Sequence, residues 1–229
     1  MRAGLQRAGL SRQLPALLLI VAVLVFALVA IALQFVRNDL DWLRATLSLY
    51  LHGPHAVWLR AAYCLLAVAI AGFAVMLYRQ AQGRARRGLP AALFAVAGLG
   101  LAAVAIGDSV LPQRAPLLAP LLHGLAAQTA FLCVTVAMLL QAWCFAHDAR
   151  WQRVQPLAWW WAWLAFAGLW LHVLWRDSPR GLGQKLVIAA VLGWLLLVAL
   201  ASCWRSRKET PETSGCGHNG DTSTTGNPP

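Results

Sequence analysis

Apolar residues gather in six long runs, and most polar residues lie between these runs. Each run is close to the ~20 residues that a helix needs to cross the ~30 Å hydrocarbon core of a bilayer. The six runs cover residues 15–33, 56–77, 90–107, 118–145, 157–174 and 186–203. The pattern therefore predicts an all-α, polytopic membrane protein with six transmembrane helices.

The segments between the runs differ in positive charge. If the N-terminus is cytoplasmic, the cytoplasmic segments hold twelve Lys and Arg residues and the outer segments hold seven, as the positive-inside rule requires. We expect a cytoplasmic N-terminus (1–13), a membrane domain (14–204) and a disordered cytoplasmic tail (205–229), in which Cys216 and His218 would bind a metal only weakly. The first run can also be read as a signal peptide, but its length favours a retained helix.

Composition supports this assignment. Only 12% of the 229 residues are charged, whereas soluble domains average about 25%. The formal charge of +11 is better explained by topology and anionic lipid than by nucleic acid. Seventeen of the nineteen basic residues are arginine, which, with the abundance of Ala, Leu and Trp, favours a GC-rich bacterial source. We therefore expect a protein of the bacterial cytoplasmic (inner) membrane, with membrane lipid as its partner and no nucleic acid.

The connector between the first two runs carries several polar residues at suggestive spacings. On an α-helix ended by Gly53-Pro54, the residues Asp41, Arg44, Ser48 and His52 would share one face. We expect a short amphipathic helix on the outer leaflet before the second span. The alternative is an ordinary Asp41–Arg44 surface pair and a Ser48 that bonds its own helix.

Further ionisable residues lie at the same predicted face of the membrane. Asp108, His123 and His172 are at the outer ends of three different runs, and such residues are default candidates for a functional site. Arg60, about one turn inside the second span, is expected either to reach the outer headgroups or to pair with Asp108. The candidate site is an outer-face polar cluster: Asp41, Arg44, Ser48, His52, Asp108, His123 and His172.

Three stretches resemble one bacterial six-helix membrane family. They are "LDWLRATLSLYLHGPHAVWLRAAY", "AVAIGDSVLP…LLHGLAAQTAFL" and "GLGQKLVIAAVLGWLLL". The family is domain of unknown function family 998, and the resemblance covers roughly residues 15–203. The positions that match its motifs are Asp41, Ser48, Asp108, Pro112, His123, Gly124, Gly183 and Lys185. The resemblance implies a fold and a membrane location, but no reaction.

Three functions remain open at this point. The first is a non-enzymatic protein that binds or moves a small or lipid-like ligand in an outer-facing polar vestibule, with no cofactor. The second is a membrane-embedded hydrolase that uses Ser48 with Asp and His side chains. It could work with a zinc ion, as in the alkaline ceramidase and adiponectin-receptor type of zinc amidases that Ser48-x-x-x-His52 weakly resembles, or without metal. The third is a partner subunit or assembly factor, for which the small residues of "AVAGLGLAAVAIG" would permit close helix contact. A haem between His123 and His172 is a further alternative.

Overall fold

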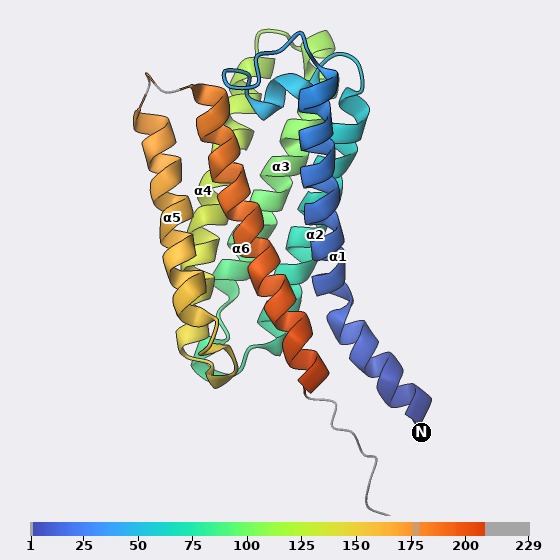
Figure 1. Cartoon of the computed structure of the whole chain (residues 1–229), viewed down its shortest axis with the longest axis vertical. Coiled ribbons are helices and arrows are strands. Elements are labelled where there is room, and N and C mark those ends of the chain that lie inside the picture. Colours follow the sequence, from blue (N-terminus) through green and yellow to red (C-terminus); the bar gives the residue numbers. More distant parts are fainter. Residues whose placement is uncertain (1, 176, 178, 209–229) are drawn as a thin grey trace, which may run out of the picture.

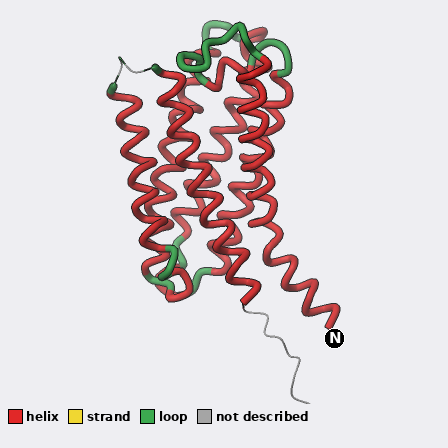
Figure 2. The backbone as a smooth tube through the Cα atoms, viewed as in Figure 1, coloured by secondary structure: helices red, strands yellow, loops and turns green. Residues whose placement is uncertain are grey.

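The six predicted spans are six long helices in a computed structural model that describes residues 2–175, 177 and 179–208. The helices are α1 (Arg2–Val36), α2 (Ala56–Gln80), α3 (Gly88–Arg114), α4 (Ala119–Ala146), α5 (Gln155–Leu174) and α6 (Arg180–Lys208). Each contains a segment long and apolar enough to cross a membrane. The described part of the chain contains helices and loops but no strand (Figure 2). The predicted fold class is therefore confirmed.

The helices form a closed ring. Each long helix packs against the next one in the sequence, and α6 returns to pack against α1. The start of α1 and the end of α6 lie at the same end of the bundle (Figure 1). We call the opposite end, which carries segments 37–55 and 115–118, the distal end. Because α1 buries Leu19 and Ala22 completely within this ring, it is an integral part of the bundle.

Small residues on α3 allow close packing inside the bundle. A Cβ atom added at Gly98 would lie 2.9 Å from the Ala67 carbonyl oxygen of α2. A Cβ atom added at Gly100 would lie 2.9 Å from the Ala126 carbonyl oxygen of α4. These glycines therefore permit internal contacts with α2 and α4. Both glycines thus contribute to packing within the bundle, and the partner-subunit interpretation stays a prediction.

Two tryptophans join α5 to α6. The indole nitrogen of Trp161 donates to the Ala190 carbonyl oxygen at 2.9 Å, and that of Trp194 donates to the Ala158 carbonyl oxygen at 2.8 Å. Trp194 is completely buried, whereas Trp160 and Trp163 on α5 are exposed. Hydrogen bonding of the indole N–H is what allows tryptophan to lie inside an apolar bundle.

The connector before α2 differs from the expected amphipathic helix. A helix is present there, but it is the five-residue 3₁₀ helix η1 (Leu47–Leu51), and residues 38–44 form turns. Leu47, Tyr50 and Leu51 are buried, so η1 packs into the distal end and does not lie on the surface. The single α-helical face shared by Asp41, Arg44, Ser48 and His52 was therefore a wrong prediction. Two shorter 3₁₀ turns, η2 (Gly83–Ala85) and η3 (Ala149–Trp151), connect helices at the other end.

The helices extend past the predicted apolar runs. Their last turns are polar, and a hydropathy pattern locates only the apolar part of a helix. α3 continues to Arg114, and α6 continues to Lys208. The first residues of the expected tail are therefore helical. Cys216 and His218, with the rest of the tail from residue 209, lie outside the described residues.

Candidate functional site

A pocket opens at the distal end between η1, α3 and α4. Its volume is about 350 Å³, within the range of about 300–1,000 Å³ that is usual for small-molecule sites. We call it the vestibule. Its walls are formed by Ser48, Leu49, His52, Asp108, Pro116, Ala119, Pro120 and His123.

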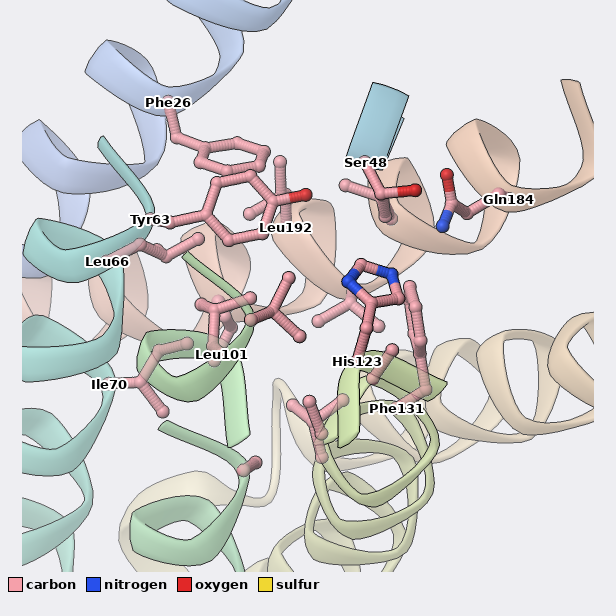
Figure 3. Close-up of a pocket in the computed structure, with 18 residues that line it drawn as sticks. Phe26, Ser48, Tyr63, Leu66, Ile70, Leu101, His123, Phe131, Gln184 and Leu192 are labelled. Atoms are coloured by element: carbon pink, nitrogen blue, oxygen red, sulfur yellow. The ribbon is translucent and has the colours of Figure 1, made fainter. Parts of the chain in front are cut away.

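A second space lies inside the bundle and shares Ser48 and His123 with the vestibule. This apolar cavity, of about 80 Å³, is lined by side chains of α1, α2, α3, α4 and α6. Figure 3 shows Ser48, Gln184 and His123 close together on one side of it, with Leu66, Ile70 and Leu101 on the other. Tyr63 directs its hydroxyl group into the space between them. The two spaces therefore meet at a polar junction formed by Ser48 and His123.

The apolar cavity is deep and narrow. From His123 to Val134 on α4, and from Gln184 to Leu195 on α6, the lining covers about 16 Å at about 1.5 Å of rise per residue. Half of a ~30 Å hydrocarbon core is about 15 Å, so the cavity reaches the middle of the bundle's membrane-spanning part. It contains less free volume than a cavity of roughly 150 Å³ that holds a benzene molecule.

Asp108 and His123 form a hydrogen-bonded pair across α3 and α4. The Nδ1 atom of His123 lies 2.8 Å from Oδ1 of Asp108. An ionised Asp108 carboxylate would only accept this hydrogen bond, in which case Nδ1 donates and a neutral ring keeps Nε2 as an acceptor. Asp108 is 9% exposed, and its Oδ2 atom is buried with no hydrogen-bond partner among the described residues. The pair therefore places a buried carboxyl group and an imidazole ring oriented by it at the junction.

The start of α6 holds the connector that forms the vestibule wall. The Leu182 backbone N–H donates to the Leu43 carbonyl oxygen at 2.8 Å, and Gln184 Oε1 accepts a hydrogen bond from the Leu47 N–H at 2.7 Å. Gly181 has no side chain, which allows this approach, because a Cβ atom there would collide with the Ala45 carbonyl group. The matched stretch "GLGQKL" is thus a docking segment for the connector.

Three basic side chains bind the same connector. Arg37 donates through Nη1 to the His52 carbonyl oxygen at 2.7 Å and holds both carboxylate oxygens of Asp39 at 2.7 Å. Arg60 donates to the Leu51 carbonyl oxygen at 3.0 and 2.6 Å. Lys185 donates to the Trp42 carbonyl oxygen at 2.5 Å. Arg60 therefore bonds the connector and not Asp108, so the expected pair with Asp108 was wrong, whereas its contact with outer headgroups stays a prediction.

The ion pair of Arg37 and Asp39, just after α1, changes the pKa of Asp39. The hydrogen bond from Arg37 lowers the pKa of the Asp39 carboxyl group below its ordinary value. Gly53, with φ at +83°, lies beside this pair, and a Cβ atom there would be 3.0 Å from Arg37 Nη1. Only glycine adopts this conformation without strain, so the Gly-Pro break brings the connector back to Arg37.

The structure brings together four of the seven predicted site residues: Ser48, His52, Asp108 and His123 all line the vestibule. Asp41 and Arg44 form an exposed pair at 3.8 Å and do not line it. The hydroxyl group of Ser48 pairs with that of Thr46 at 3.0 Å.

His172 lies elsewhere, between α5 and α6. A Cβ atom added at Gly183 would be 2.6 Å from His172 Nδ1, so Gly183 leaves room for the imidazole ring. That Nδ1 atom is buried with no hydrogen-bond partner among the described residues. Within the described ranges, no group of three His, Cys, Asp or Glu side chains is arranged to hold a metal ion. The zinc version of the hydrolase therefore has no donor set in this part of the chain.

Sequence reasoning missed Gln184, Tyr63 and the anchoring role of Arg37. Gln184 and Tyr63 line the apolar cavity, and each is a polar residue beside or within an apolar run. That signal was available in the sequence. The depth of the cavity was not, because it depends on which faces of five helices meet.

Comparison with protein families identifies one match. The model of the family described as "Protein of unknown function (DUF998)" matches residues 20–201. No curated protein and no solved structure matches the chain significantly. Because the match covers most of the sequence, the chain belongs to the DUF998 family, and with its six apolar helices it is a multi-pass membrane protein.

Proposed function

We propose that this DUF998 protein binds a single-chain amphiphile, with the polar head in the vestibule and the chain in the apolar cavity. One observation carries the proposal: the polar vestibule and the apolar cavity share Ser48 and His123. A ligand that crosses this junction must be polar at one end and apolar at the other, because burying a polar group in the cavity without a partner is costly.

The narrowness of the cavity favours one alkyl chain over a bulkier group. Its lining includes flexible side chains such as Leu101, Ile188 and Leu192, and changes of their rotamers would widen it. Widening the cavity exposes apolar side-chain surface, but the alkyl chain of the ligand then covers that surface, so the net cost in free energy is small. The depth of the apolar cavity then sets the alkyl-chain length beyond which affinity no longer rises.

We also propose that the vestibule faces outward from a bacterial cytoplasmic membrane, with both termini in the cytoplasm. The support is the excess of Lys and Arg on the side of the termini. A single cysteine placed at Asp41 in a chain without its native cysteines would test this orientation. We expect labelling by an impermeant maleimide in intact cells, and protection from that reagent would contradict the orientation.

A series of alkyl alcohols from hexyl to tetradecyl tests the proposed function on the full chain in nanodiscs. Affinity should rise with chain length and then stop rising once the chain fills the lined depth. Ala97, buried at the inner end of the cavity, provides the variant: Ala97→Leu should move the limit to shorter chains. Ala103→Leu, exposed on the same helix, is the matched control and should leave the limit unchanged. An affinity that rises without limit and is identical in both variants would reject the proposal.

Hydrolysis of a bound ester is a second candidate function, favoured by the 2.8 Å contact between Asp108 and His123. This contact orients an imidazole as a serine hydrolase requires. Ser48 would exchange its partner Thr46 for His123 and attack the ester carbonyl carbon. Its proton would pass through His123 Nε2 to the departing alcohol, and water would then release the acid by the same route.

The test of this second function is the release of p-nitrophenol from its decanoate ester by the full chain. Wild-type protein should release it faster than Ser48→Ala, while the control Ser109→Ala should behave as wild type, because the Ser109 hydroxyl group bonds the Ile106 carbonyl oxygen of its own helix. Equal release by wild type and Ser48→Ala would exclude Ser48 as a nucleophile. The proposal of ligand binding does not depend on that result.

A further inference from the structure

Three basic residues of the distal end bond backbone carbonyl groups and do not line the vestibule. Arg37, Arg60 and Lys185 donate to the carbonyl oxygens of His52, Leu51 and Trp42, respectively. These three carbonyl groups all belong to the connector that forms the vestibule wall. The guanidinium and ammonium groups are thus used to hold the connector in place.

Three other arginines among the described residues of this end lie in solvent. Arg44 is paired with Asp41 and is 87% exposed, and the side chains of Arg114 and Arg180 are also exposed. None of the three lines the vestibule. Among the described residues, the titratable groups that face it are His52 from the connector, Asp108 from α3 and His123 from α4.

This set of groups is unfavourable for an anionic head group. Proteins bind carboxylates and phosphates with Arg or Lys, frequently through bidentate contacts. Here an anion would lie beside the Asp108 carboxyl group, which is 9% exposed and has one oxygen with no hydrogen-bond partner among the described residues. Repulsion between like charges is strong at a buried site because the local dielectric constant is low.

The same set is favourable for a head group that donates hydrogen bonds. Nδ1 of His123 lies 2.8 Å from Oδ1 of Asp108, and in the neutral tautomer that donates to an ionised carboxylate, Nε2 is an acceptor. The hydroxyl group of Ser48 lies at the same junction and can accept as well. An ammonium group would in addition be attracted by the negative charge of Asp108.

We infer that the ligand's head group is a hydrogen-bond donor without negative charge, a primary amine or a hydroxyl group, which is recognised at the junction of Asp108, His123 and Ser48. This inference rests on the proposed function, since it names the class of amphiphile that the same site would take. It excludes fatty acids and alkyl phosphates as the preferred ligands.

The test compares four decyl compounds that share one chain: decylamine, decanol, decanoate and decyl phosphate. Binding to the full chain in nanodiscs of neutral lipid is measured, and partitioning into protein-free discs is subtracted. Decylamine and decanol should bind at least about tenfold more tightly than the two anions. Asp108→Asn should reduce this difference to about twofold or less, whereas Ser109→Ala, on the same helix, should preserve it.

The possible outcomes separate the two claims. Equal or tighter binding of decanoate or decyl phosphate by wild type would overturn the inference and leave the proposed function standing. No binding of any decyl compound above that of protein-free discs would overturn both. The ranking in wild type decides the matter even if Asp108→Asn does not fold, and a preserved ranking in a folded Asp108→Asn protein would remove Asp108 from the recognition.

Discussion

Gly181→Ala should separate the start of α6 from the connector. The added Cβ atom would collide with the Ala45 carbonyl group, and that group belongs to the backbone, so relief requires the two segments to move apart. Two hydrogen bonds cross this contact, from Leu182 N–H to the Leu43 carbonyl oxygen and from Leu47 N–H to Gln184 Oε1. Each is worth about 0.5–1.5 kcal/mol, so their loss should lower the free energy of unfolding by about 1–3 kcal/mol.

Gly72→Ala is the matched control, because a Cβ atom at Gly72 would meet nothing within 4 Å. Both variants gain helix propensity, so the difference between them isolates the collision. The assay is unfolding by titration with a denaturing detergent in mixed micelles, followed by circular dichroism. Equal stability of the two variants, with hydrogen exchange in segment 42–47 as slow as in wild type, would show that the connector is not docked on α6 in this way.

Three further predictions concern the surroundings of the site. Asp39→Asn should remove an acid-induced loosening of segment 37–53. Because the pKa of Asp39 is lowered in the folded protein, its contribution to stability is present above the ordinary pKa of 3.8 and is lost as the pH falls through the lower folded value. Hydrogen exchange of that segment at acid pH measures this, and equal loosening in variant and wild type would contradict it. Arg60→Ala should lower the free energy of unfolding by about 1–3 kcal/mol. The control Arg44→Ala, at an exposed position, should change it by less than about 0.5 kcal/mol. Similar values for both variants would argue against a role of Arg60 in holding the connector. His172→Leu removes a buried nitrogen that has no hydrogen-bond partner among the described residues, so the free energy of unfolding should stay within about 1 kcal/mol of wild type or rise. Decanol affinity should not change, and a loss of affinity would return His172 to the site.

The helices could be predicted from the sequence because each apolar run satisfies a single physical requirement, the length needed to cross a bilayer. The connector could not be predicted in the same way. Its conformation depends on contacts that are distant in sequence, such as that between Leu47 and Gln184. Residues spaced i, i+3 and i+7 from Asp41 share one face only if the segment is an α-helix. Here the segment docks on α6 and forms turns and η1 instead.

The candidate site was predictable in part. Asp108 and His123 were grouped from their predicted depth, and they lie within hydrogen-bonding distance because α3 and α4 are adjacent antiparallel helices. His172 has a similar predicted depth but lies on the side of α5 that faces Gly183. Depth can be read from a hydropathy pattern, whereas the facing of a helix depends on packing with its neighbours, and here that packing separates His172 from the vestibule.

The proposed position of the alkyl chain can be tested by photolabelling with a decyl amine that carries a diazirine at the end of its chain, followed by mapping of the labelled residues by mass spectrometry. This position predicts labels at the inner end of the apolar cavity, on Ile70, Ala97, Val134 and Leu195, and their loss when excess decanol competes. Labels confined to lipid-facing residues such as Leu99 and Leu164, with no effect of decanol, would contradict it.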